Sequence, residues 1–183
     1  FVKNNTYYGF YTGHNPNVQS SCVTTKEGIM MATSTNPEVG FTKNQSFTTI
    51  YAPKGMQFDE QDNFRDPYVF EDAGIYYMLV SARANVGGVF KGVIASYTST
   101  DLLSWTYDGI FYDGGAKYFF FMETAQVFKM GSMYYLLFSD INSRKVTYRK
   151  SSSATGPWEQ PTGSEFLDGN DFYAAKAVSN GTD

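Results

Sequence analysis

The chain is poor in the residue types that build disulfides and metal sites. Its 183 residues include one cysteine, Cys22, and one histidine, His14. A single cysteine excludes an internal disulfide and a zinc cluster, and it leaves the cellular compartment open. His14 stands in the turn-like stretch TGHNPN, which is typical of a loop residue rather than a base or ligand. The sequence also has no glycine-rich phosphate loop, metal-ligand spacing or Ser-His-Asp arrangement, so we expect no metal and no cofactor.

Charged residues and long apolar runs are also scarce. Charged residues make up 17% of the chain and the net charge is −4, which argues against a nucleic-acid or anionic-membrane partner. No apolar run reaches the ~20 residues that a membrane-spanning helix needs. Aromatic residues are abundant instead, with 15 tyrosines and 16 phenylalanines in a chain that is 42% hydrophobic. This composition predicts a globular protein with a large aromatic core and argues against disorder.

Strand signals dominate the chain. Short runs rich in Tyr, Phe, Val, Ile and Thr are separated by clusters of Gly, Asn, Asp and Pro, and no window has a convincing helical period. One pattern of two aromatic residues, an apolar run and a small polar end occurs three times: TYYGFYTG from Thr6, GIYYMLVSA from Gly74 and SMYYLLFSD from Ser132. Each copy is followed by a second strand-like stretch, a Ser/Thr-rich turn and an aromatic residue. The stretches DPYVF and METAQVF add a further strand before the second and third copies.

Repeating units of ~50–70 residues with about four strands each are typical of β-propeller blades. We therefore predict an all-β chain with two nearly complete blades and a partial blade before them that lacks its first strand. The stretch DFYAAKAVSN would begin another blade. A closed propeller has about four to eight blades, so residues 1–183 are expected to form about three blades of a partial propeller domain. A β-sandwich with coincidental repeats is the alternative.

Two acidic residues open the innermost strands of successive blades. Asp66 begins DPYVF and Glu123 begins ETAQVF, so a propeller would point both carboxyl groups into one central funnel. Glycoside hydrolases use converging carboxyl groups. One protonates the leaving oxygen, and another attacks the sugar or activates water. Either acid could instead cap a strand or meet a surface arginine. Because the two acids share a position in two repeats, we give the functional and the structural interpretations equal weight.

The neighbours of these two acids predict different roles for them. Glu123 follows KYFFFM, and an apolar, aromatic surrounding raises the pKa of a carboxyl group, as a general acid requires. Asp66 stands beside Arg65, which favours the ionised form of the carboxyl group. An ionised aspartate is a hydrogen-bond acceptor, so Asp66 is suited to binding sugar hydroxyls.

Other acids and one tyrosine are further candidates. The acids of residues 59–62 form a polar run that is expected to be a solvated loop. Asp168 and Asp171 precede the last predicted inner strand, where one could be structural and the other could reach the funnel rim. Tyr173 is expected to form a wall that stacks on a sugar or donates its hydroxyl to one.

Several stretches together resemble glycoside hydrolase family 32, the family of invertases, levanases and inulinases. FRDPYVF is similar to its Arg-Asp-Pro motif, FMETAQVFKMGSMYYLLFSD to its Glu-containing motif, and DGNDFYAAKAV to its later Phe-Tyr-Ala motif. YYGFYTGHNP and IMMATSTNPEVGFTK are similar to the strands before the Arg-Asp-Pro blade. The matches occur in the family's order and span essentially the whole chain. The resemblance implies a five-bladed propeller, often with a C-terminal β-sandwich, that hydrolyses β-fructofuranosides with retention.

The resemblance also implies roles for four residues. Glu123 would be the general acid/base, Asp66 the transition-state stabiliser that holds fructosyl hydroxyls, Arg65 a pocket residue near them, and Tyr173 a pocket wall. The family's nucleophile is an aspartate in an Asn-Asp-Pro-type motif on the first blade, and no such motif occurs here. We therefore expect the 183 residues to lack the first blade and the end of the propeller, and to be inactive on their own.

One departure from the family pattern keeps alternatives open. The family usually has Cys-Pro after the acid/base glutamate, whereas this chain has Thr124-Ala125. A non-catalytic sugar-binding propeller is one alternative, and a five-bladed glycosidase acting on arabinans or xylans is another, although the FRDP stretch favours fructosides. The expected partner is a carbohydrate. Linkage, exo or endo action and oligomeric state stay open, and an extracellular or cell-envelope location is favoured only because polymer-cleaving enzymes are usually exported.

Overall fold

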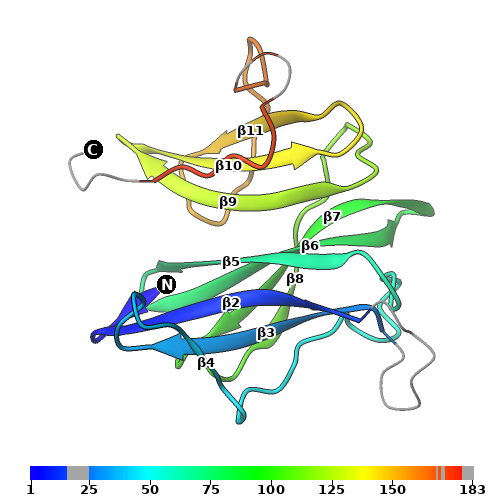
Figure 1. The fold of residues 1–183 in the computed structure, drawn as a ribbon. Helices are drawn as coiled ribbons and strands as arrows, with labels where there is room; N and C mark the ends of the chain where they lie inside the picture. Colours follow the sequence, from blue (N-terminus) through cyan, green and yellow to red (C-terminus); the bar gives the residue numbers. More distant parts are fainter. Residues whose placement is uncertain (16–24, 168, 170–171, 179–183) are drawn as a thin grey trace.

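The computed structural model describes residues 1–15, 25–167, 169 and 172–178, which form three antiparallel sheets stacked one on another (Figure 1). The first sheet contains β1 (Val2–Lys3), β2 (Thr6–His14), β3 (Glu27–Ser34) and β4 (Thr42–Lys43), in that order. The middle sheet contains β5 (Phe64–Asp72), β6 (Ile75–Val86), β7 (Val89–Ser99) and β8 (Thr106–Tyr112). The third contains β9 (Met122–Met130), β10 (Met133–Asp140) and β11 (Lys145–Ser151). Within the described ranges, no helix is long and apolar enough to cross a membrane.

Two-residue turns produce the up-and-down order of the middle sheet. Gly87 and Gly88, with φ angles of 59° and 87°, connect β6 to β7. Ala73 and Gly74, with φ angles of 50° and 81°, connect β5 to β6. Positive φ at both central residues is the geometry of a type I′ turn, whose twist matches that of the flanking strands. The two hairpins therefore place three consecutive strands side by side.

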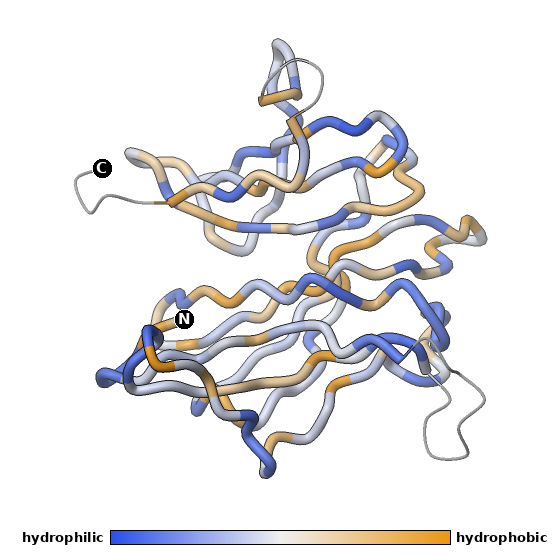
Figure 2. The backbone as a smooth tube through the Cα atoms, viewed as in Figure 1, coloured by the Kyte–Doolittle hydropathy of each residue, from blue (hydrophilic) through white to orange (hydrophobic). Residues whose placement is uncertain are grey.

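Side chains of β6 point alternately to its two faces, and each face packs in a different hydrophobic core. Met78, Val80 and Ala82 pack in the core that also contains Ile29 of the first sheet. Leu79, from the opposite face of β6, packs in the core shared with the third sheet. Successive side chains of a strand point to opposite faces, so one apolar strand can join three layers. Figure 2 shows hydrophobic residues recurring along the strands of all three layers.

These sheets confirm the prediction of an all-β partial propeller, and they correct two details of it. The first sheet was expected to lack its inner strand, but β1 pairs with the start of β2. Residues 172–178 were expected to open another blade, but they form no strand. Ala177 instead exchanges hydrogen bonds of 2.7 and 2.8 Å with the side chain of Gln126 on β9. The Gln126 side chain supplies these bonds, where a neighbouring strand would supply backbone bonds. Residues 172–178 are therefore held against β9 without joining a sheet.

The inner strands β5 and β9 lie beside each other and run in the same direction. Arg65 near the start of β5 contacts Glu123 near the start of β9, and further along Tyr68 donates to the carbonyl of Val127 at 2.9 Å. Side chains at the two strand starts therefore meet at one end of the stacked sheets. This end carries the candidate site.

Candidate active site

The starts of β5 and β9 share the same backbone irregularity. On β5 the pairing with β6 shifts between Arg65 and Tyr68, and on β9 the pairing with β10 shifts between Glu123 and Gln126. A positive φ angle occurs inside each irregularity, 59° at Asp66 and 54° at Thr124. A non-glycine residue in this region is uncommon and a β-branched one is strained, and such strain clusters at functional sites. At these bulges Arg65 contacts the Glu123 side chain and the Asp66 carboxylate contacts the Thr124 N–H, so the two irregularities face each other.

This shared geometry corrects the predicted equivalence of Asp66 and Glu123. Arg65 pairs with Ser81 of β6, as Glu123 pairs with Ser139 of β10. Glu123 therefore corresponds to Arg65, and Asp66 corresponds to Thr124. The two acids are offset by one residue. Both strands carry the same bulge, so the offset is also visible in the sequence when RDPYVF is aligned with ETAQVF on the shared Val-Phe pair. They still lie close together, because the N–H of Thr124 donates to the Asp66 carboxylate at 3.1 Å.

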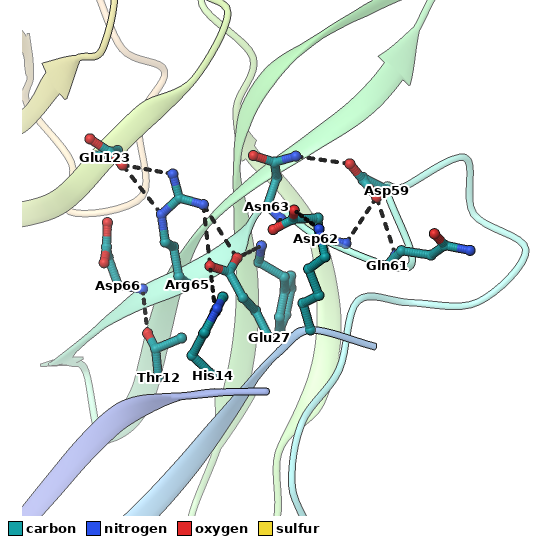
Figure 3. A network of polar contacts seen from close by, with 12 residues as sticks. Thr12, His14, Glu27, Asp59, Gln61, Asp62, Asn63, Arg65, Asp66 and Glu123 are labelled. Carbon is teal, nitrogen blue, oxygen red and sulfur yellow. Dashed lines mark hydrogen bonds and ion pairs between the residues drawn. The ribbon is translucent and has the colours of Figure 1, made fainter. Parts of the chain in front are cut away.

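Arg65 is held between two carboxylates from different sheets (Figure 3). Its Nη2 and Nε donate to Oε1 of Glu123 at 2.7 and 3.2 Å. Its Nη1 lies 3.3 Å from Oε2 of Glu27. The ring of Phe121 supports the guanidinium group at 4.1 Å. Arg65 was predicted to stand against Asp66, but the side chain reaches away from its chain neighbour toward Glu27 and Glu123.

Besides Lys176, which is described below, Glu27 is a residue of this site that sequence reasoning missed. It begins β3, and its side chain is 7% exposed. Besides facing Arg65, it accepts a hydrogen bond from the N–H of Phe64 at 2.8 Å and lies 3.7 Å from Nδ1 of His14. No motif marks Glu27, and its position opposite His14 follows from the β2–β3 pairing. A lone glutamate opening a strand that is otherwise apolar was the available signal.

Asp66 has a surrounding opposite to the predicted one. Its N–H donates to Oγ1 of Thr12 at 3.0 Å, and its Oδ2 accepts the N–H of Thr124. Burial raises the pKa of the Asp66 carboxyl above its ordinary value, and the Thr124 N–H and the Arg65 charge only partly offset that rise. Arg65 does favour the ionised form of Asp66, as predicted, but burial outweighs it, so the expectation of an easily ionised Asp66 is wrong in its net direction.

Glu123 has polar partners as well as the predicted aromatic neighbours. Its side chain is 15% exposed, and Tyr173 donates its hydroxyl to Oε2 while Arg65 binds Oε1. The Tyr173 ring lies 3.9 Å from the guanidinium of Arg144. Burial, together with the bond to Glu123, raises the pKa of the Tyr173 hydroxyl. The structure thus places all four predicted site residues, Arg65, Asp66, Glu123 and Tyr173, in one cluster.

Lys176 adds a cation to the Asp66 side of the cluster. Its Nζ donates to the carbonyls of Thr124 and Ala125 at 2.8 and 3.1 Å. Burial of the ammonium group lowers the pKa of Lys176 to about 8, although the nearby Asp66 carboxylate opposes this shift. Lys176 therefore ties residues 172–178 to the irregular part of β9.

The rival acids of residues 59–62 lie in the loop before β5, where Asp59 binds its own loop and Asp62 binds a residue of another segment. Asp59 accepts the N–H groups of Gln61 and Asp62, and Asp62 binds Lys26 at 3.0 Å. Asp168, Asp171 and Cys22 lie outside the described residues. In the part of the chain that the structure describes, no group of three or more His, Cys, Asp or Glu residues could hold a metal ion. The cluster offers acids, a phenol and cations within hydrogen-bond reach of one another, which suits proton transfer and the binding of hydroxyl groups.

Curated proteins of Escherichia coli match much of the chain. A sucrose-6-phosphate hydrolase is 29% identical over 127 residues, which cover 63% of this chain and 26% of the relative. A raffinose invertase is 28% identical over 148 residues, which cover 68% of this chain and 30% of the relative. The chain thus spans between a quarter and a third of the length of these proteins.

Solved structures match the fold over nearly all of the chain. A GH32 β-fructofuranosidase of Bombyx mori has a TM-score of 0.73 at 22% identity, covering 99% of this chain and 39% of that one. A sucrose-6-phosphate hydrolase of Lactobacillus gasseri has a TM-score of 0.73 at 20% identity, covering 95% and 36%. The family model for the glycosyl hydrolases family 32 N-terminal domain matches residues 1–183. The chain belongs to glycosyl hydrolase family 32 and forms part of its N-terminal propeller domain.

Proposed function

We propose that the protein containing this chain hydrolyses β-fructofuranosidic bonds, with substrates of the sucrose, inulin or levan type. The observation that carries the proposal is the convergence of Glu123 and Asp66 at the starts of adjacent inner strands. Membership of family 32 supports it, as do relatives that are named for sucrose-6-phosphate and raffinose hydrolysis. One solved relative from Bombyx mori was determined in complex with sucrose, which supports a carbohydrate as the substrate.

Glu123 would act as the general acid and then as the general base. A general acid must hold a proton for the leaving oxygen and regain it from water in the second step. Oε1 of Glu123 is held by Arg65, so Oε2, which receives the Tyr173 hydroxyl, is the oxygen left to exchange a proton. Tyr173 would then be a pocket wall that also orients this carboxyl group.

Asp66 would hold fructosyl hydroxyls as the transition state forms. One of its oxygens is bound by the Thr124 N–H, which fixes the plane of the carboxyl group and leaves Oδ1 to accept from a sugar hydroxyl. Because the pKa of Asp66 is raised, its carboxyl group ionises at a higher pH than an ordinary aspartate. The hydrogen bonds to the sugar would be strongest above that pH. Arg65 would be a pocket residue that positions Glu123.

A retaining mechanism also needs a nucleophile. We propose that residues 1–183 form a partial propeller and that another part of the full-length protein supplies this group, since the relatives are about three to four times as long as the matched region. The 183 residues alone would then bind sugar without completing turnover.

A substrate panel tests the proposal. The full-length protein is incubated with sucrose, inulin, levan, arabinan and xylan, and released monosaccharides are quantified by chromatography. Release of fructose from at least one fructoside, with neither pentose released, is the expected result. Release of arabinose or xylose would contradict the fructoside assignment. Binding of sugars without any hydrolysis would instead identify a non-catalytic propeller.

A further inference from the structure

A second cluster of aromatic and cationic groups lies on the same face of the middle sheet as Arg65. Arg65 is paired with Ser81 on β6, and Arg83 is two residues further along β6, so the three side chains point to the same side. Arg83 is therefore about 7 Å further along the strand, toward the tip of the β6–β7 hairpin. Phe90 of β7 pairs with Asn85 and so shares this face as well.

Two phenylalanine rings enclose the guanidinium group of Arg83. Its Cζ lies 4.4 Å from the centroid of the Phe90 ring and 3.9 Å from that of the Phe120 ring. Both rings stay open to solvent, with Phe90 40% and Phe120 38% exposed. Phe120 precedes Phe121, whose ring supports Arg65. In the segment before β9, Phe120 thus belongs to this second cluster and Phe121 to the active-site cluster. We call the second cluster, which consists of Arg83, Phe90 and Phe120, the rim shelf.

Gly92 makes the close approach of this segment possible. It lies opposite Arg83 on β7, and its N–H donates to the carbonyl of Phe119 at 2.8 Å. A Cβ at this position would lie 2.7 Å from the Cα of Phe121, which is closer than side chains tolerate. The absence of a side chain at Gly92 therefore lets Phe120 lie over Arg83, and it fixes the rim shelf next to the site.

The hydrogen-bonding capacity of Arg83 is largely unused. Its Nη2 donates to the carbonyl of Phe90 at 3.3 Å, whereas its buried Nε has no hydrogen-bond partner among the described residues. The described part of the chain also contains no carboxylate that forms an ion pair with Arg83. A ligand cannot reach the buried Nε, but no described residue accepts a hydrogen bond from Nη1. An arginine with stacked faces and this donor at its edge suits an acceptor-rich ligand.

We propose that the rim shelf is a subsite for a third sugar unit, on the leaving-group side of the bond that Glu123 would cleave. The inference rests on the proposed function and adds a preference for trisaccharides over sucrose. Carbohydrate rings pack their C–H faces on aromatic rings and offer hydroxyl oxygens to N–H donors, which are the two kinds of group that the shelf presents. Its place one strand further from the funnel than Arg65 suits a unit beyond the glucosyl group of sucrose.

The test compares substrates that differ by one sugar. Raffinose and 1-kestose each carry a third unit on the leaving-group side, and sucrose lacks it. In the full-length protein, Phe90→Ala and Phe120→Ala are each expected to lower kcat/KM for at least one trisaccharide by about 3- to 10-fold, while kcat/KM for sucrose changes less than about 2-fold. Val89→Ala is the matched control, since Val89 belongs to the same hairpin but lies on the opposite face, and it should change neither value.

Binding to the Glu123→Gln variant separates this inference from the proposed function. Calorimetry in this background should show a trisaccharide affinity that exceeds the sucrose affinity, and Phe90→Ala should remove the excess. Equal losses for sucrose and both trisaccharides, or no loss for either trisaccharide, would overturn the subsite. A selective loss for sucrose 6-phosphate would also overturn it, by identifying a phosphate site. If no fructoside is hydrolysed while the trisaccharide preference in binding persists, the proposed function fails, and the rim shelf remains a sugar-binding site but not a leaving-group subsite.

Discussion

Arg65 connects two acids from different sheets, between which the described residues form no other link. Glu27 comes from the first sheet and Glu123 from the third, and Arg65 in the middle sheet binds both. A bidentate-capable guanidinium group fixes the orientation of a carboxyl group better than an ammonium group can. We therefore propose that Glu27 is a positioning residue, which would act on Glu123 through Arg65.

Replacing Glu27 by glutamine tests this role. The amide keeps an acceptor for the Phe64 N–H but removes the negative charge, so Arg65 stabilises the Glu123 carboxylate alone. The rate of fructose release should fall about 10-fold through kcat rather than KM, and the alkaline limb of the pH–rate profile should move to lower pH. Glu38→Gln, at an exposed carboxylate in the turn between β3 and β4, is the control and should behave as wild type. An unchanged alkaline limb would contradict the positioning role.

At the scale of strands and loops, the sequence predicted where the inner strands begin but not how their side chains are aimed. The aromatic repeats and the Arg-Asp-Pro stretch located β5 and β9, because strand periodicity is a local property. The bulges at Asp66 and Thr124 depend on pairing with β6 and β10, and the partners of Arg65 lie 38 and 58 residues away. Glu27 was missed for that reason, and the direction of the Asp66 pKa was wrong.

A buried arginine of the third sheet contacts both the second sheet and a carboxylate that follows β11, away from the site. Arg149 of β11 is 1% exposed, donates to the Tyr112 hydroxyl of β8 at 2.6 Å and lies 2.9 Å from Oε2 of Glu165. Lys117 also binds Glu165. Removing one member of a buried pair leaves the other charge uncompensated, which is costlier than replacing both with apolar groups.

Urea unfolding of the full-length protein should show this difference. Arg149→Met is expected to lower the free energy of unfolding by about 3 kcal/mol, because Lys117 compensates Glu165 only in part. The double variant Arg149→Met/Glu165→Leu should be more stable than the single one. Lys150→Met, next along the same strand, serves as the control. Wild-type stability in Arg149→Met would show that Glu165 does not depend on Arg149 for compensation of its charge.

At the scale of the whole molecule, the fold brings residues distant in sequence to one end of three stacked sheets. Glu27, Arg65 and Glu123 each stand at or next to the start of a strand, and residues 172–178 bring Tyr173 and Lys176 to the same place. The propeller was predictable because its repeat unit is written three times in the sequence. The position of residues 172–178 was not predictable, because contacts with individual side chains hold this segment and no repeat pattern marks such contacts.

The pH dependence of stability tests how residues 172–178 are held. The pKa of Lys176 is lowered from 10.5 to about 8, so between these values the unfolded chain binds more protons than the folded one. Stability therefore rises with pH across this window. Relative to Lys176→Met, the wild-type protein should gain stability in urea unfolding between about pH 8 and 10.5. A stability difference that does not vary with pH would show that the ammonium group is fully hydrated.

The rate of fructose release by Glu123→Gln tests the account most directly. Glutamine preserves the acceptor for Arg65 but cannot protonate the leaving oxygen, so the full-length variant should release fructose about 10²- to 10⁴-fold more slowly than wild type. Glu159→Gln, at an exposed carboxylate following the same sheet, should keep the wild-type rate. A wild-type rate in Glu123→Gln would remove Glu123 from the chemistry and contradict the account.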